Sequence, residues 1–232
     1  DTNIEALKGI SFEVQKGQTL AIIGNTGSGK STILELIGRL YDVQKGDIKV
    51  DGKPIQSLNL NSLRSSIGFV PQDPFLFSDS LRNNIKFGKN KASDDEVKRA
   101  SKMAVVHDNI INFKNGYDTV LGERGITLSG GQKQRVSIAR AFIKNPQILL
   151  LDDCLSAVDT ETEEQILNNI ELVTKGKTTI IVSHRISSAK NADMIVVLNN
   201  GIITQQGAHQ ELINVEGYYK ELYQNQLQEI SS

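Results

Sequence analysis

The 232-residue sequence has little cysteine and no long apolar run, and both shortages restrict its class. Its single cysteine, Cys154, excludes an internal disulfide and suits a reducing compartment. No stretch approaches the roughly 18–20 apolar residues that a membrane-spanning helix requires, and no signal peptide is recognisable. A formal net charge of −1 lacks the basic excess of nucleic-acid-binding domains. We therefore expect a soluble chain with no nucleic-acid partner.

What the sequence does contain is typical of a globular protein, with 38% apolar and 23% charged residues. Its 232 residues are enough to bury a sizeable core within one domain. Because the sequence opens on Asp1 and has no initial Met, we expect it to be a segment cut from a longer polypeptide.

Strand and helix patterns alternate over much of the chain. Apolar or alternating runs predict strands at residues 9–15, 18–23, 67–70, 147–152, 178–182 and 194–198. Hairpin turns are expected within residues 46–55 and at 199–201, before 202–207. Helices are predicted at residues 32–39, 93–106, 131–144, 160–173, 186–190 and 217–227. This order indicates an α/β fold with a mostly parallel sheet covered on both faces, plus an antiparallel β portion and a mostly helical middle block.

A glycine-rich loop follows the apolar strand at 18–23 and precedes a helix. Its sequence, GNTGSGKS, matches G-x-x-x-x-G-K-[ST], in which backbone N–H groups point inward at phosphate oxygens. Lys30 would reach the β- and γ-phosphates and the Ser31 hydroxyl would ligate Mg²⁺. The alternative is a glycine-rich turn without a ligand, but it leaves the Lys-Ser pair unexplained. We expect a nucleoside triphosphate to contact Gly24, Asn25, Thr26, Gly27, Ser28, Gly29, Lys30, Ser31 and Thr32.

Two adjacent acids stand at the end of the apolar run ILLLDD. Asp152 ends the strand where such sites hold Mg²⁺ through a carboxylate, although an acid at a strand end can also merely cap the next turn. Asp153 is placed to orient or deprotonate an attacking water, and its alternative role is that of a solvated loop acid. The phosphate loop favours the functional interpretation of both.

His184 follows another apolar strand, in TTIIVSH. Parallel strands present their C-terminal ends at one edge of a sheet, where ligands bind. At that edge His184 would contact the γ-phosphate or the attacking water, although a lone histidine at a strand end is often only a satisfied polar group. His107 and His209 lack this context and are interpreted as surface residues.

A second phosphate-binding pattern, LSGGQKQR, covers residues 128–135. It places a serine and a glycine pair at the start of a helix, where free N–H groups favour an anion. One nucleotide needs only one such cradle, so the second predicts contact with a nucleotide held by another chain. The motif resembles the signature of ATP-binding cassette (ABC) proteins. The resemblance implies ATP contacts from Ser129, Gly130, Gly131 and Gln132.

The resemblance covers essentially the whole chain in five ordered motifs. Gly24–Thr32 resembles the Walker A loop and Ile148–Asp152 the Walker B strand. Gln72 resembles the Q-loop glutamine, which implies contact with Mg²⁺ and the attacking water. Leu155–Asp159 resembles the D-loop that crosses the dimer interface, which implies that Asp159 lies beside the nucleotide. His184 resembles the switch histidine.

The family pattern implies one ABC ATPase domain over residues 1–232 with a P-loop NTPase core. Residues 1–70 and 147–232 would form the core with its antiparallel β portion, and 73–130 the helical arm with the signature. The implied catalytic residues are Asp153, His184 and Gln72. The implied cofactors are ATP and Mg²⁺, the latter held by Ser31, Gln72 and Asp152.

Two segments resemble those with which ABC exporters receive the coupling helices of their transmembrane domains. They are Pro74–Gly88 and Thr119–Gly125, the second with Val-Leu where exporters carry Glu-Val. The sequence FLF within the first segment is typical of an exposed aromatic surface, although Phe75 and Phe77 could instead pack within the arm. The implied partners are transmembrane domains and a second nucleotide-binding domain, at the cytoplasmic face of a membrane.

Two features depart from the family pattern. An aromatic that stacks on adenine is missing, since the chain begins after its expected position, and we expect weaker ATP binding for that reason. Asp153 stands where the family carries Glu, and a carboxylate misplaced by about 1 Å can slow a reaction on the order of 10²-fold. In the family, this Asp is typical of the degenerate half of a heterodimeric exporter. Because His184 is retained, a homodimer with two slow sites is also compatible.

The sequence therefore predicts the motor domain of an ABC exporter, which binds and hydrolyses ATP and dimerises head to tail around two ATP molecules. The alternative is an ATP-gated dimerisation switch with negligible hydrolysis at its own site. Soluble cassettes of DNA repair or translation fit less well. The segment between Gln72 and Leu128 carries no heptads, and the chain holds one cassette rather than a tandem pair.

Overall fold

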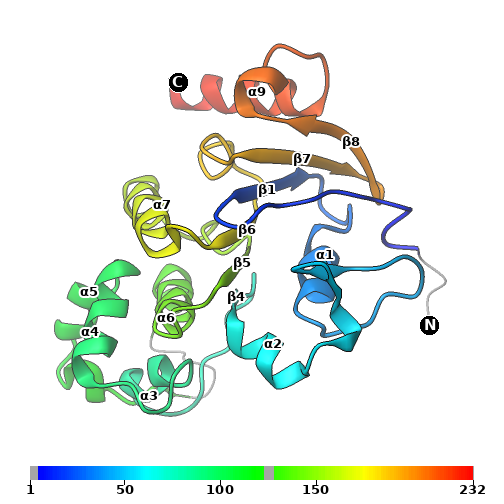
Figure 1. The fold of residues 1–232 in the computed structure, drawn as a ribbon. Helices are drawn as coiled ribbons and strands as arrows, with labels where there is room; N and C mark the ends of the chain where they lie inside the picture. Colours follow the sequence, from blue (N-terminus) through cyan, green and yellow to red (C-terminus); the bar gives the residue numbers. More distant parts are fainter. Residues whose placement is uncertain (1–4, 123–127, 232) are drawn as a thin grey trace.

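The computed structural model describes residues 5–122 and 128–231, and these contain one six-stranded sheet (Figure 1). The strands lie in the order β4-β5-β6-β1-β7-β8. Neighbouring strands are parallel except for β7 and β8, which form an antiparallel hairpin. The sheet consists of β1 (Thr19–Gly24), β4 (Ile67–Val70), β5 (Ile148–Asp152), β6 (Thr178–Val182), β7 (Met194–Asn199) and β8 (Ile202–Gly207).

Strands β1, β5, β6 and β7 are buried on both faces, as their uninterrupted apolar runs predict, whereas the edge strand β8 has alternate residues exposed. Side chains alternate across a strand, so Leu20 and Ile22 of β1 pack with Leu34 of helix α1 (Lys30–Ile37). Ala21 and Ile23 point to the opposite face and pack near α9 (Tyr218–Ser231). Helices α6 (Gly130–Phe142) and α7 (Thr160–Thr174) cover that same face beside β4 and β5 (Figure 1). The sheet therefore forms the middle layer between two layers of helices.

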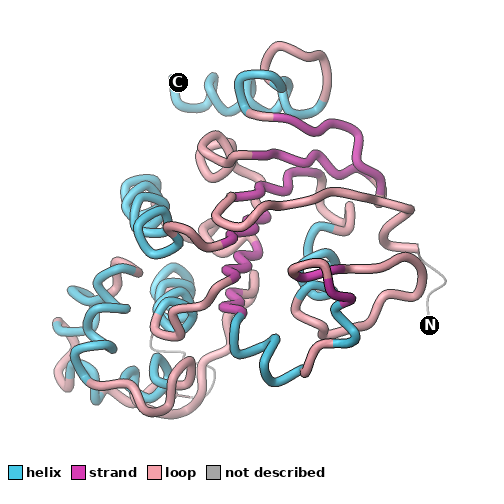
Figure 2. The backbone as a smooth tube through the Cα atoms, viewed as in Figure 1, coloured by secondary structure: helices cyan, strands magenta, loops and turns pink. Residues whose placement is uncertain are grey.

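The expected antiparallel β portion is a short hairpin of β2 (Lys49–Val50) and β3 (Lys53–Pro54). Asp51 and Gly52 both have positive φ, of 50° and 74°, the backbone that a two-residue hairpin turn requires. Figure 2 shows this hairpin apart from the large sheet, on the side of α1. The predicted mixed α/β class is therefore confirmed.

The middle block is helical and packs against α6. Its α4 begins at a capping box in which Ser93 Oγ accepts from Glu96 N, as the Ser-x-x-Glu pattern predicts. Buried side chains of α3, α4 and α5 share one apolar cluster with α6 and α7. The division of the chain into core and arm stays a prediction. The remaining helices are α2 (Leu60–Ser66), α3 (Leu81–Lys86), α4 (Asp94–Met103), α5 (His107–Ile111) and α8 (His209–Leu212).

Residues 9–15 are not a strand, contrary to the prediction. Ile10, Phe12 and Val14 are half-buried on the α1 side of the sheet, while Ser11 and Glu13 are exposed. The alternation of apolar and polar residues therefore correctly indicated which side chains of this segment face the sheet and which face solvent. A strand also needs a hydrogen-bonded partner strand, and no ladder joins this segment to another among the described residues.

Residues 186–190 form turns instead of the expected helix. Ile186 N donates to the side chain of Gln226, and the hydroxyls of Ser187 and Ser188 donate to Glu163. The polar groups of this segment are therefore directed to α7 and α9, which competes with the backbone hydrogen bonds of a helix.

None of the helices within residues 5–122 and 128–231 is long and apolar enough to cross a membrane.

Candidate functional site

The predicted chemical residues meet at one edge of the sheet because three parallel strands end there, β5 and β6 level with each other and β1 two residues further on, at Gly24. Val182 of β6 pairs with both Ile22 of β1 and Asp152 of β5. Beyond the last pairs, Asp153 N donates to Val182 O at 2.9 Å, and Ser183 N donates to Ile22 O at 3.2 Å. This edge therefore carries the phosphate loop, the two acids and the segment with His184.

All three glycines of the phosphate loop have positive φ, and two of them show most directly why glycine is needed. Gly24 ends β1 with φ of 157°, and a Cβ there would lie 2.1 Å from Leu198 O of β7. Gly29 starts α1 with φ of 100°, a left-handed backbone that favours glycine. Residues 25–27 of the loop are exposed, whereas Ser28 is buried and its Oγ has no hydrogen-bond partner among the described residues.

Lys30 and Ser31 open α1 and turn toward the loop and the first acid. Lys30 Nζ is buried and donates to the carbonyl oxygens of Gly24 and Asn25, both at 2.8 Å. Burial lowers the pKa of Lys30, while the nearby acids raise it. Ser31 Oγ donates to Asp152 Oδ1 at 3.0 Å, which brings together the two side chains predicted to hold Mg²⁺.

Both acids are almost fully buried, with 6% exposure for Asp152 and 9% for Asp153. Burial raises the pKa of each carboxyl, and the hydrogen bond from Ser31 lowers that of Asp152. The Ser31 hydroxyl and the Asp152 carboxylate are two oxygen ligands that suit Mg²⁺. This ion binds proteins through one or two carboxylates and keeps several waters and phosphate oxygens as its other ligands.

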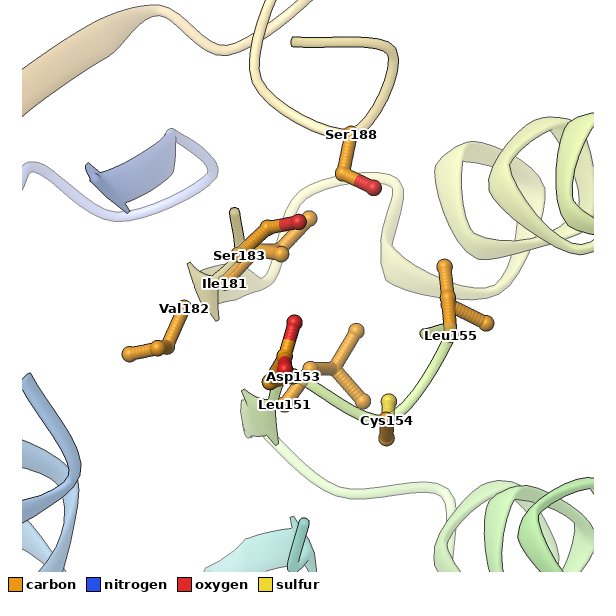
Figure 3. Close-up of a pocket in the computed structure, with 8 residues that line it drawn as sticks. All are labelled: Leu151, Asp153, Cys154, Leu155, Ile181, Val182, Ser183 and Ser188. Atoms are coloured by element: carbon orange, nitrogen blue, oxygen red, sulfur yellow. The ribbon is translucent and has the colours of Figure 1, made fainter. Parts of the chain in front are cut away.

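Asp153 has an unusual backbone for its residue type, with φ of 41°. Its backbone N–H donates to Val182 O at 2.9 Å, which holds the residue at the end of β6, and the charge and backbone N–H of His184 lower the pKa of its carboxyl. Figure 3 shows Asp153 pointing toward the segment after β6, beside a cavity of about 10 Å³ that Cys154 and Ser188 also line. The second acid is therefore tied back to the sheet edge.

His184 is half-buried on the segment after β6. Burial lowers the pKa of its imidazole and Lys30 lowers it further, whereas Asp153 and Asp152 raise it. The histidine thus lies within the electrostatic reach of all the charged groups at this edge. The structure brings together five of the predicted residues, namely Lys30, Ser31, Asp152, Asp153 and His184.

Gln72 is not joined to that cluster. It is exposed after β4, and its side chain makes no hydrogen bond to Ser31 or Asp152 within the described residues. Its backbone oxygen accepts from Gln134 Nε2 at 3.4 Å. A cavity of about 470 Å³ adjoins it, lined by Gln72, Asp73, Pro74, Phe75, Leu76, Gly130, Lys133, Gln134 and Ala157.

The signature residues begin α6 at a distance along the fold from the phosphate loop. Ser129 Oγ accepts from Gln132 N at 3.2 Å, and Gln132 Oε1 accepts from Ser129 N at 3.0 Å, so the two form a capping box. A Cβ at Gly131 would lie 2.8 Å from Ala157 O, whereas one at Gly130 would have room. Asp159 is exposed and caps α7 by accepting from Thr162 N.

No hydrogen bond within the described residues joins residues 129–132 or Asp159 to the phosphate loop. The two phosphate-binding patterns are therefore not linked by hydrogen bonds within the part of the chain that the structure describes. That the second cradle serves another chain stays a prediction.

The aromatic surface expected from FLF is present. Phe75 and Phe77 are 57% and 37% exposed, and Phe87 lies 4.7 Å from Phe77 between ring centroids. Leu76 points inward and is buried. Arg140 of α6 lies over the rings of Phe77 and Phe87, at 5.6 Å from each centroid. Of the second coupling segment, residues 123–125 lie outside the described residues.

Two histidines were interpreted incorrectly as surface residues. His107 and His209 are half-buried, and each ring Nδ1 is 2.8 Å from a tyrosine hydroxyl, that of Tyr117 and Tyr219 respectively. Each tyrosine lies ten positions later in the chain, on another element. The sequence alone does not reveal these two pairs, because the path of the chain between each histidine and its tyrosine determines whether they meet.

Sequence reasoning also missed a buried ionic cluster beside the site. Glu163 of α7 is 1% exposed and pairs with Arg185, the residue after His184. Its Oε1 accepts from Ser187 Oγ at 2.6 Å and from Ser188 Oγ at 3.0 Å. Arg185 also donates to the carbonyl oxygen of Ser156, so the cluster links the segment after β6 to the segment after β5.

Comparison with known proteins gives consistent matches. Residues 7–156 match the family model described as ABC transporter. The chain is 51% identical over 222 residues to ATP-binding cassette sub-family B member 6 of Xenopus tropicalis, covering 96% of this chain and 26% of that protein. It is 49% identical over 223 residues to a Staphylococcus aureus protein named "Putative multidrug export ATP-binding/permease protein", covering 96% of this chain and 39% of that protein.

A solved structure, that of a bacterial Atm1-family ABC exporter with ATP bound, matches with a TM-score of 0.94 and 46% identity. The match covers 97% of this chain and 40% of that one. The chain thus spans about a quarter to two-fifths of the proteins it matches. The resemblance to ABC exporters is confirmed, and the chain belongs to the ABC transporter family.

Proposed function

We propose that this chain is the ATP-binding and ATP-hydrolysing domain of an ABC exporter. The observation that carries the proposal is the cluster of Lys30, Ser31, Asp152, Asp153 and His184 at one sheet edge. A buried cation, a hydroxyl paired with an acid, and a second acid beside a histidine are the groups that phosphoryl transfer to water requires. The match to an exporter solved with ATP bound supports the same conclusion.

Each group has a distinct role in this proposal. Lys30 neutralises charge on the β- and γ-phosphates, and its present bonds to loop carbonyls show that its ammonium lies within the loop. Ser31 and Asp152 hold Mg²⁺, with Gln72 joining from the segment after β4. Bound there, Mg²⁺ would supply positive charge that offsets the charge of the phosphates. Asp153 and His184 orient the attacking water and its proton.

The second cradle completes the site of another chain. Ser129, Gly130, Gly131 and Gln132 would contact an ATP molecule bound to a second nucleotide-binding domain, with Asp159 at the interface. The positive end of α6 favours the phosphate anion there. The partner is an identical or a sister domain. Transmembrane domains would dock on the aromatic surface of Phe75, Phe77 and Phe87, which places the chain at the cytoplasmic face of a membrane.

The turnover of the chain's own site is proposed to be slow. Asp153 is short, and the bond from its backbone N–H to Val182 O holds the residue back at the end of β6. The same observation supports the second candidate function, an ATP-gated dimerisation switch with negligible hydrolysis at this site. The two candidates share ATP binding and dimerisation and differ only in turnover.

ATP binding is tested by Lys30→Ala. A hydrogen bond to a charged group contributes about 1.5–3 kcal/mol, so we expect ATP affinity to fall at least about tenfold in calorimetric titration. Lys45→Ala, at an exposed lysine, serves as the control and is expected to bind as the wild type does. Equal affinities of the two variants would remove the phosphate loop from the proposed site.

Dimerisation is tested by Gly130→Glu. The structure leaves room for a side chain at Gly130, and an acid in the first turn of α6 favours the helix. The variant should therefore fold and bind ATP normally, while its added charge repels the phosphates of the partner's nucleotide. We expect ATP to produce dimers of the wild type and of Gly130→Ala in analytical ultracentrifugation, but not of Gly130→Glu. Dimers of Gly130→Glu would contradict the proposed role of the second cradle.

A further inference from the structure

The segment that carries His184 is clamped by one side chain of the C-terminal helix α9. Gln226 Nε2 donates to His184 O at 2.8 Å, and Gln226 Oε1 accepts from Ile186 N at 2.8 Å. One amide thus bonds the two backbone groups on either side of Arg185. The pattern reproduces the pair of bonds that neighbouring strands exchange, so it fixes both the position and the rotation of this backbone.

The backbone of His184 is held by Gln226 and lies beside Asp153. Its carbonyl oxygen accepts from Gln226, and its N–H helps to lower the pKa of the Asp153 carboxyl. The imidazole shares its electrostatic surroundings with Lys30 and both acids. Any shift of the Gln226 amide is therefore transmitted directly to the backbone that carries the imidazole.

Helix α9, which carries Gln226, is packed against the sheet. The two hydrogen bonds of the Gln226 amide, here called the clamp, therefore start from a well-packed helix. Tyr219 is fully buried and packs in one cluster with Ile186 and Ala189 of the turn after His184. Tyr219 N donates to Gln205 Oε1 of β8 at 3.1 Å. Figure 1 shows α9 lying across the β7 and β8 end of the molecule. The sheet, α9 and the turn at 186–190 thus form one packed unit.

We propose that Gln226 is a positioning residue for His184, through which α9 sets the turnover rate of the ATP site. The proposal rests on the function proposed above for His184. Among the described residues, Gln226 makes no hydrogen bond to the phosphate loop or to the two acids, so we expect its effect to act through the placement of the imidazole. A geometric error of about 1 Å in a reacting group can cost on the order of 10²-fold in rate. A loosened segment should cost less, about tenfold.

The test compares Gln226→Ala with Gln224→Ala, a control on the same helix at an exposed position. Three quantities are measured for each: hydrogen exchange of the Ile186 amide, ATP affinity, and kcat in both the wild-type and Asp153→Glu chains. For Gln226→Ala we expect faster exchange at Ile186 and a kcat about tenfold lower. ATP affinity should stay unchanged, because Lys30 and Ser31 keep their surroundings. Gln224→Ala should match the wild type in all three.

Gln226→Glu separates the two halves of the clamp. Glutamate keeps an acceptor for Ile186 N but loses the donor for His184 O. Exchange at Ile186 should therefore stay close to the wild-type rate while kcat still falls. If Gln226 served only to stabilise the fold, Gln226→Glu would lower the melting temperature but would not lower kcat while leaving amide exchange at Ile186 unchanged.

Three outcomes would overturn the proposal. Unchanged exchange at Ile186 in Gln226→Ala would mean that the clamp does not hold this backbone in solution, and faster exchange with wild-type kcat would mean that it does not position His184. His184→Ala, measured in parallel, distinguishes a failure of the positioning role of Gln226 from a failure of the function proposed for His184. If it lowers kcat and Gln226→Ala does not, only the positioning role fails. Full turnover in His184→Ala, or none in any chain, would refute the proposed function and this inference together.

Discussion

Glu163→Ala is expected to lower the free energy of unfolding by about 3 kcal/mol, the largest stability loss we anticipate in this chain. Removing one partner of a fully buried ion pair costs about 3–5 kcal/mol, because the other charge is left uncompensated. The cost should lie at the lower end here, since the Arg185 side chain is 36% exposed and can partly rehydrate. Ser187 and Ser188 also lose their common acceptor. Thermal unfolding should shift by roughly 6–12 °C.

Glu164→Ala provides the matched control, because Glu164 is the next residue of α7 and is exposed. Glu163→Gln should fall between the two, since its amide oxygen still accepts from the serine hydroxyls but carries no charge for Arg185. If Glu163→Ala and Glu164→Ala unfolded at the same temperature, the buried cluster would contribute nothing to stability. Circular dichroism melting curves of the three variants decide the matter.

The cluster also has a functional consequence. Arg185 bonds the carbonyl oxygens of Ser156 and Val158, which lie in the segment assigned to the D-loop. Glu163 holds Arg185 in the orientation that reaches both. Loss of Glu163 should therefore loosen the segments after β5 and β6 together, and we expect their amides to exchange faster in the same variant.

The order of elements could be predicted from the sequence because each depends on local patterns. β5 and β6 are short, continuous apolar runs, and β1 leads directly into a glycine-rich loop that only a phosphate-binding turn explains. Parallel strands share their direction, so the C-terminal ends of β1, β5 and β6 brought Ser31, Asp152, Asp153 and His184 to one edge. The site was predictable to the extent that its residues stand at strand ends.

What could not be predicted depends on contacts between distant segments. Gln226 looks like any surface glutamine of a helix, and only the packing of α9 against the turn at 186–190 directs its amide to His184. Glu163 lies between other acids in TETEE, so no pattern marks it as the buried one. Residues 9–15 failed as a strand for the same reason, because a ladder requires a partner that alternation does not specify.

Asp153→Glu is expected to raise ATP turnover by about 10- to 100-fold, the largest gain that one substitution should produce. The backbone of Asp153 is held at the end of β6 by the bond from its N–H to Val182 O. One more methylene group moves the carboxylate outward by roughly 1–1.5 Å, a distance over which catalytic geometry changes rates strongly. The gain should be seen in steady-state phosphate release at saturating ATP, with ATP affinity nearly unchanged.

The same substitution at the neighbouring acid should act in the opposite direction. Asp152 already accepts from Ser31 Oγ at 3.0 Å, so a longer side chain would push Ser31 away from its place beside Mg²⁺. Asp152→Glu is therefore expected to lower turnover while Asp153→Glu raises it. A general effect of added length or of altered stability would change both in the same sense.

Stability gives an independent check on Asp153→Glu. The backbone of Asp153 is left-handed, with φ of 41°, and aspartate tolerates this conformation better than glutamate does. The variant should therefore be less stable, by about 1 kcal/mol or less, even as its turnover rises. Equal turnover in the wild-type and Asp153→Glu chains would show that the shorter acid is already competent. The site would then not be slow, and the case for two unequal sites in a heterodimer would lose its chemical basis.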